Sequence, residues 1–169
     1  VSISSWPMWT AEEKRVLSND VIERINKEVA RYPKPRAACV EAMKIVQQEH
    51  GWVSDTHLAE VAGLLGMSVE ELDSIATFYN LIFRRPVGRH VILACDSVSC
   101  WLNGSERLRR ALTEHTGAEL GQTSEDGCFT LLPMVCLGAC EGAPAIMVDD
   151  DLHTNLSEEG LEALLDRYR

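Results

Sequence analysis

Four of the six cysteines stand in two close pairs, Cys95-x4-Cys100 and Cys136-x3-Cys140. Cysteine thiolates bind soft metal ions. Four of them suit either a [2Fe-2S] cluster, with one pair on each iron, or a tetrahedral zinc ion. The spacing does not separate these two sites, because zinc loops commonly use two to four intervening residues. Two disulfides or unconnected thiols are the remaining interpretations.

The second cysteine pair lies in a loop of small residues, 136–144 (CLGACEGAP). Small residues let the backbone approach a metal centre closely and present N–H groups to sulfur. Hydrogen bonds to sulfur, together with burial and charge, tune the reduction potential of a cluster. An ordinary turn needs neither two cysteines nor this composition, so the loop favours a cluster.

An apolar run of residues ends at or just before the first cysteine of each pair. Residues 90–95 (HVILAC) and 129–135 (FTLLPMV) are short and apolar, as buried strands are. A helical stretch with Leu108, Ala111 and Leu112 connects them. Strand, helix and strand predict a βαβ unit with parallel strands. Because the carboxyl ends of parallel strands lie at the same edge of a sheet, we expect both pairs to meet there.

The remainder of the C-terminal half completes a small α/β domain. Residues 145–148 and 152–156 flank an acidic turn and predict a β-hairpin. We interpret the three aspartates of residues 149–151 as turn residues rather than as a cation site. A last helix is predicted over residues 157–168.

Four short amphipathic helices are predicted before residue 86, and together they indicate a small bundle. In the first, apolar residues recur at every fourth position from Leu17 to Val29. Ser68 and Glu71 form a capping box for the fourth. Residues 1–15 show little periodicity, and we interpret them as a loosely ordered arm.

Several reactive or charged side chains are assigned structural roles. Cys39 lies on the inner face of a predicted helix and Cys128 has no close cysteine neighbour, so neither is expected to bind metal. The five histidines show no metal-ligand spacing among themselves. We expect Phe78 and Tyr79 to lie in the core, at helical spacing. We expect a solvated loop to carry the basic residues Arg84, Arg85 and Arg89.

Composition narrows the class of protein. The net charge of −10 argues against a nucleic-acid partner, which needs clustered Lys and Arg. No apolar run approaches the roughly 18 residues of a membrane-spanning helix, so direct membrane insertion is not expected. No signal-peptide pattern is found, and we expect no secretion. The sequence shows no nucleophile with its base, no phosphate-binding glycine loop and no G-x-G-x-x-G after a strand, which agrees with a carrier rather than a complete enzyme.

Seven short motifs spread over the chain carry a resemblance to a known family. They are residues 35–38 (PRAA), 51–53 (GWV), 76–79 (ATFY), 86–90 (PVGRH), 95–100 (CDSVSC), 129–133 (FTLLP) and 136–140 (CLGAC). With them the chain resembles the E subunit of bacterial NADH:quinone oxidoreductase, the 24-kilodalton-type subunit of respiratory complex I.

The resemblance implies an α+β/α/β fold. An N-terminal arm and four-helix region, residues 1–85, would precede a thioredoxin-like domain, residues 86–169, whose mixed sheet holds a [2Fe-2S] cluster. Pro144 resembles the proline of thioredoxin-like folds that often follows a cis bond. No side chain would be catalytic. The cluster ligands implied by the resemblance are Cys95, Cys100, Cys136 and Cys140.

The resemblance also implies partners. The cluster would accept electrons from the FMN of a larger iron–sulfur subunit that binds FMN and NADH, among further subunits of the peripheral arm of complex I. The chain would be cytoplasmic and peripheral to the inner face of the cell membrane through that complex. Quinone reduction and proton translocation would belong to other subunits.

Three rival functions stay open. Related subunits serve NAD-linked hydrogenases and formate dehydrogenases, where the chain would be a small iron–sulfur subunit. A zinc-stabilised adaptor whose helices bind partners uses the same cysteines. A thiol–disulfide oxidoreductase ranks last, because Cys-x-x-Cys is missing.

Overall fold

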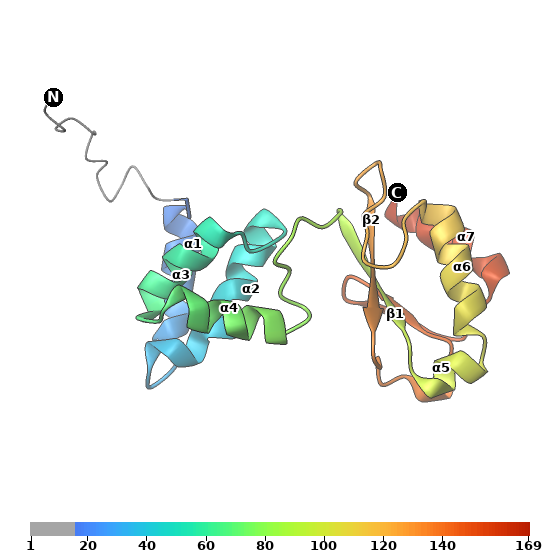
Figure 1. Cartoon of the computed structure of the whole chain (residues 1–169), viewed down its shortest axis with the longest axis horizontal. Helices are drawn as coiled ribbons and strands as arrows, with labels where there is room; N and C mark the ends of the chain where they lie inside the picture. The colour runs from blue at the N-terminus through green and yellow to red at the C-terminus, as the bar shows by residue number, and fades with distance from the viewer. Residues whose placement is uncertain (1–15) are drawn as a thin grey trace, which may run out of the picture. The chain divides into compact units, whose positions relative to one another are not determined.

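The computed structural model describes residues 16–169, and the chain divides into two compact units between Pro86 and Val87 (Figure 1). The predicted arm, residues 1–15, lies outside the described residues. The assignment of two domains stays a prediction. Within residues 16–169 the structure has no helix that is both long and apolar enough to cross a membrane.

The first unit is helical, and its four predicted helices are confirmed (Figure 1). A short 3-10 turn, Pro35–Ala38, precedes the second helix, with proline at its first position where no backbone donor is needed. The helices are α1 (Asn19–Val29), α2 (Cys39–His50), α3 (Asp55–Leu65) and α4 (Val69–Phe78).

Two of these helices begin with reciprocal caps. The hydroxyl of Ser68 accepts the N–H of Glu71 at 3.1 Å, and the Glu71 carboxylate accepts the N–H of Ser68 at 3.4 Å, which confirms the predicted capping box. At α3 the Ser54 hydroxyl accepts the N–H of His57, and His57 Nδ1 accepts the N–H of Ser54 at 3.3 Å. Gly66 ends α3 in the left-handed region, at φ 63°.

The core of the first unit follows the predicted stripes except at the end of α4. Phe78 is 81% exposed and Tyr79 is 46% exposed, so the expectation that they are core residues is wrong. The buried residues of α4 are Leu72 and Ala76. Phe78 stands two positions after Ala76, which places it on nearly the opposite side of the helix.

Arg84 is also placed differently from the prediction. Its side chain is only 17% exposed, and its Nε donates to Asp73 Oδ1 at 2.8 Å. Its two terminal nitrogens reach Asp55, at 2.6 Å, and the carbonyl of Val53. The segment after α4 is therefore fastened to the helical unit by a mostly buried guanidinium. The prediction that these basic residues lie in a solvated loop is confirmed for Arg85 and Arg89, which are exposed, and is wrong for Arg84.

The second unit contains a mixed four-stranded sheet, as expected. Its strand order is β2-β1-β3-β4; β1 pairs with β2 in parallel and with β3 in antiparallel orientation. The parallel pair confirms the predicted βαβ unit, and Cys95 lies opposite Met134 in its register. The strands are β1 (His90–Cys95), β2 (Phe129–Met134), β3 (Ile146–Val148) and β4 (Asp151–His153).

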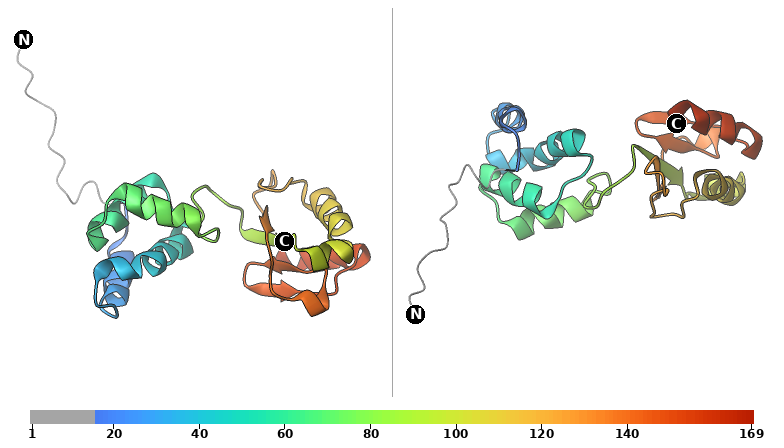
Figure 2. Two further views of the ribbon diagram at one scale, coloured as in Figure 1. Left: turned by 60° about the horizontal axis from the view of Figure 1, so that its bottom comes forward. Right: turned by 90° about the horizontal axis from the view of Figure 1, so that it is seen from above.

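Helices cover one face of this sheet. Figure 2 shows α6 (Ser105–Thr116) and α7 (Glu158–Leu165) side by side against the strands, and their apolar residues share one core with β1, β2 and β3. A separate helix α5 (Val98–Leu102) precedes α6 and is not predicted, since five residues are too few to show a helical period. A final 3-10 turn, Asp166–Tyr168, follows α7.

The acidic turn between β3 and β4 is confirmed as a hairpin turn. Asp149 adopts φ 52°, a conformation that Asp tolerates better than most residues. Its carboxylate accepts the N–H of Val91 at 2.9 Å and contacts His90 Nδ1 at 2.7 Å. The aspartate thus closes the turn onto the neighbouring strand β1.

Candidate metal centre

The first cysteine pair lies at the carboxyl end of β1. Cys95 is the last residue of the strand, and its N–H donates to the Ala145 carbonyl at 3.3 Å. Cys100 follows on α5. Both side chains are buried, 3% and 1% exposed, and both pack with Ala139 and Ala145 in one small apolar cluster. The strand end and the short helix therefore bring these two sulfurs together.

The pKa values of the two buried thiols are shifted in opposite directions. Burial raises the pKa of Cys95, but the Ser97 and Leu137 backbone, the Ser97 hydroxyl and Cys100 outweigh it and lower the pKa below its ordinary value. Burial raises the pKa of Cys100, and its hydrogen bond to Cys95 raises it further.

The second cysteine pair is exposed in the loop after β2. Cys136 follows the strand by two residues, and Cys140 opens the 3-10 turn Cys140–Gly142. Gly138 adopts φ 78°, which L side chains rarely do, and its N–H donates to Cys136 Sγ at 3.3 Å. The prediction that this loop presents N–H groups to sulfur is confirmed.

The two cysteine loops touch each other. Leu137, between Cys136 and Cys140, packs against the apolar cluster that contains Cys95, and its backbone N–H lowers the pKa of the Cys95 thiol. Even so, no three His, Cys, Asp or Glu side chains within residues 16–169 lie close enough together to hold a metal ion. The structure joins Cys95 to Cys100, and the convergence of all four sulfurs stays a prediction.

The donor set fits a [2Fe-2S] cluster. All six cysteines are free thiols, so the four candidates are available as thiolates. The backbone N–H of Gly138 donates to Cys136 Sγ, and backbone N–H groups of Ser97 and Leu137 lower the pKa of Cys95, as that of Ala145 does for Cys100. Such hydrogen bonds stabilise thiolates bound to iron. The cis bond expected before Pro144 is confirmed, between Ala143 and Pro144 in the same region.

Sequence reasoning missed two side chains next to this centre. The Ser97 hydroxyl lies 3.6 Å from Cys95 Sγ. Asp96 forms an ion pair with Arg109 of α6, with 2.8 Å between Oδ1 and Nη1. Ser97 and Asp96 stand inside the 95–100 motif, which was the available signal. No sequence pattern connects Asp96 with Arg109.

The cysteines outside the two pairs have structural environments. Cys39 is buried in the core of the helical unit, as expected. Cys128 is buried one residue before β2, where Arg89 Nη2 donates to its sulfur at 3.4 Å. Neither lies in the apolar cluster that holds Cys95 and Cys100.

Comparison with known proteins identifies the family. The model of the thioredoxin-like [2Fe-2S] ferredoxin family matches residues 25–169. The E subunit of NADH-quinone oxidoreductase from Pseudomonas aeruginosa is 44% identical over 156 residues, covering 92% of this chain and 94% of that protein. The E subunit from Escherichia coli (strain K12) is 47% identical over 147 residues, covering 87% and 89%.

Solved structures agree on the fold. A crystal structure of NAD+-reducing [NiFe]-hydrogenase in the H2-reduced state matches with a TM-score of 0.67 and 22% identity. The match covers 78% of this chain and 22% of the hydrogenase chain, and at this identity it shows the fold alone. From the family match and the two bacterial relatives, we conclude that the chain belongs to the thioredoxin-like [2Fe-2S] ferredoxin family, among the E subunits of NADH-quinone oxidoreductase.

Proposed function

We propose that this chain accepts electrons from the FMN of a larger, NADH-binding partner subunit and that Cys95, Cys100, Cys136 and Cys140 hold the [2Fe-2S] cluster which makes this possible. The chain itself is an electron-transfer subunit of an oxidoreductase complex. When bound, a [2Fe-2S] cluster supplies reversible one-electron chemistry. The chain's own residues bind the irons, donate hydrogen bonds to sulfur and exclude water from one side of the site.

The observation that carries the ligand assignment is the contact between the two cysteine loops. Leu137 packs against the apolar cluster that contains Cys95, and it belongs to the loop that also carries Cys136 and Cys140. The carboxyl ends of adjacent parallel strands lie at one edge of the sheet, where ligands of such sheets bind. Cys39 and Cys128 lie in other cores and are poorly placed to join them.

The surface beside the cysteines supports a protein partner. Val98, Trp101 and Leu102 on α5 are 67%, 54% and 72% exposed, and Val135, between β2 and Cys136, is 81% exposed. Apolar side chains gathered around a site and left in water are typical of surfaces that dock another protein. Docking at this rim would bring the flavin of a partner close to the cluster and would shield both from solvent.

The same proposal assigns the cluster to a domain of residues 86–169 and leaves residues 1–85, the N-terminal arm and helical bundle, without a cofactor. It places the chain in the cytoplasm, attached to the inner face of the membrane through the other subunits of the complex. Limited proteolysis of the whole protein tests the first assignment. A cut near Pro86 should leave iron and sulfide on the C-terminal fragment.

Anaerobic titration with NADH tests the function. The chain is mixed with the FMN-containing subunit of the same complex, and the reduced cluster is followed by electron paramagnetic resonance. NADH should reduce the cluster only when the partner is present. Reduction by NADH without the partner, or none with it, would contradict the proposal.

Changing Trp101 tests the docking rim. Trp101→Ala should weaken binding of the partner at least tenfold, the effect expected of an exposed aromatic anchor. Leu120→Ala is the control, since Leu120 is also exposed but follows α6 in the chain and belongs to neither cysteine motif. Equal effects of the two substitutions would place the interface elsewhere.

A further inference from the structure

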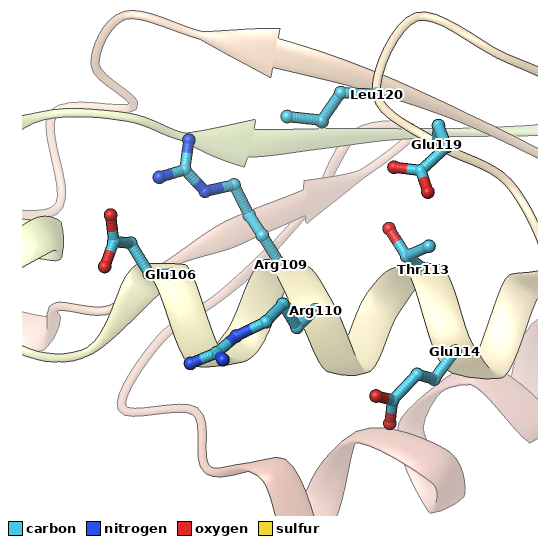
Figure 3. A pocket seen from close by; sticks show the side chains of 7 residues that line it. All are labelled: Glu106, Arg109, Arg110, Thr113, Glu114, Glu119 and Leu120. Carbon is cyan, nitrogen blue, oxygen red and sulfur yellow. The ribbon is translucent and has the colours of Figure 1, made fainter.

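Arg109 and Arg110 are neighbours on α6 and line the same open pocket, yet they point in different directions. Figure 3 shows Arg109 rising from the helix toward the strands, whereas Arg110 lies along the helix. Arg109 Nη1 meets Asp96 Oδ1 at 2.8 Å, and the Arg109 side chain is 22% exposed. Arg110 is exposed. Only the first of these two arginines is therefore directed at the cysteine loop.

Asp96 connects this ion pair to the metal centre, because it directly follows Cys95. Its backbone is held as well, since its N–H donates to the carbonyl of Met134 at 2.8 Å. The first residue of the loop between Cys95 and Cys100 is thus fixed twice, by β2 through its backbone and by α6 through its carboxylate. Asp96 also places a negative charge one residue from a cluster ligand.

We propose that Arg109 is a positioning residue for the cluster: through Asp96 it fixes the start of the 95–100 loop and cancels the negative charge that Asp96 brings beside the irons. This inference rests on the proposed ligand set. Reduction adds one negative charge to a cluster, and nearby charge, hydrogen bonds and solvent exposure set its reduction potential. The pair is half-exposed and partly screened, so its effect is a shift of the potential and not loss of the cluster.

The signs of the expected shifts are opposite for the two partners. Arg109→Gln leaves Asp96 without its counter-charge, and the reduction potential of the cluster becomes more negative. Asp96→Asn leaves the arginine without the carboxylate, and the potential becomes more positive. The double variant returns toward the wild-type value, and Arg109→Lys, which keeps the charge, stays closer to wild type than Arg109→Gln. Redox titration of the whole protein followed by electron paramagnetic resonance measures all four.

Arg110→Gln is the matched control, because it removes the same charge from the next position of the helix. A shift for Arg109→Gln no larger than for Arg110→Gln would overturn the inference. So would shifts of the same sign for Arg109→Gln and Asp96→Asn, which would indicate general loosening of the loop.

Positioning is read separately in the iron-free protein. Arg109→Gln should speed hydrogen exchange at the amides of residues 96–100, and Arg110→Gln should not. Equal exchange in the two variants counts against the inference. A wild-type protein that holds no iron and sulfide would instead overturn the proposed function, so the two failures are distinguishable.

Discussion

Leu137, in the loop after β2, packs against the apolar cluster that contains Cys95 at the end of β1, and its backbone N–H lowers the pKa of the Cys95 thiol. Leu137 stands between Cys136 and Cys140, so the contact brings the two cysteine pairs into one neighbourhood. One pair is buried and the other exposed. A centre formed by both pairs would therefore have a buried side and an open side, as a site that exchanges electrons with a partner needs.

Cys136→Ser should remove most of the visible absorbance and most of the bound iron. Serine replaces a soft sulfur ligand by a hydroxyl, which iron–sulfur clusters tolerate poorly. Cys128→Ser is the control, because Cys128 is buried beside Arg89 in another core. Iron analysis and absorption spectra of the two purified variants provide the measurement. Equal losses in both would show that the ligand set is wrong.

The helical unit should lose stability as pH falls below about 6.5, the ordinary pKa of histidine. Burial, and then the charge of His50, lower the pKa of His57 in the folded protein. Its Nδ1 accepts the N–H of Ser54 and must be unprotonated to do so. Protonation therefore favours the unfolded state, and the stability is complete only above the unfolded pKa.

His57→Gln checks this pH dependence, because glutamine keeps an acceptor for the capping box at every pH. The variant should flatten part of the fall in Tm between about pH 7 and pH 5, followed by circular dichroism. His115→Gln removes a histidine from α6, outside the helical unit, and should leave the slope unchanged. Identical slopes for wild type and His57→Gln would refute the role given to the cap.

Arg84→Met should lower the free energy of unfolding by about 2 kcal/mol, the range for hydrogen bonds to a charged group. The loss comes mainly from Asp73 and the carbonyl of Val53, since the Asp55 side chain is 95% exposed and such a pair contributes little. Arg85→Met is the control, because Arg85 is exposed and its loss should change the free energy of unfolding by no more than about 0.5 kcal/mol. Urea titration of the two variants measures both changes. Similar values would mean that Arg84 anchors nothing.

Gly142→Ala should disturb the second cysteine loop. A Cβ at Gly142 would lie 2.7 Å from Thr154 Cβ. Either the cysteine loop or the segment after β4 that carries Thr154 must therefore move, at a cost of about 1–3 kcal/mol. Gly63→Ala is the control, since nothing lies within 4 Å of the added atom there and alanine favours a helix by up to about 1 kcal/mol. Thermal unfolding should show opposite shifts of Tm, and a neutral Gly142→Ala would contradict the close approach.

Local signals explain what the sequence predicted correctly. Stripes of apolar residues predicted α1 to α4, and the pair Ser68 and Glu71 predicted a cap, because both depend only on neighbours along the chain. The apolar runs predicted β1 and β2, and a connection of this length favours parallel pairing. The loops with the four cysteines followed from these strands.

The features that were missed depend on approach in three dimensions. The residues next to Arg84 in the sequence do not show that its side chain binds Asp55 and the carbonyl of Val53. Likewise, the residues next to Arg109 do not show that it forms an ion pair with Asp96. Phe78 continues an apolar spacing from Ile75, but it is the last residue of α4. The buried face of that helix contains Leu72 and Ala76, and Phe78 lies outside it. Pattern alone does not show which side of a helix end is covered.

The central claim is that two cysteine pairs hold one cluster, and a crystal structure of the purified protein with anomalous scattering at the iron edge tests it most directly. It should show two irons bridged by two sulfides, with Cys95 and Cys100 on one iron and Cys136 and Cys140 on the other. A single zinc ion, or a cysteine pair that faces away from the other with no sulfide between them, would contradict the account.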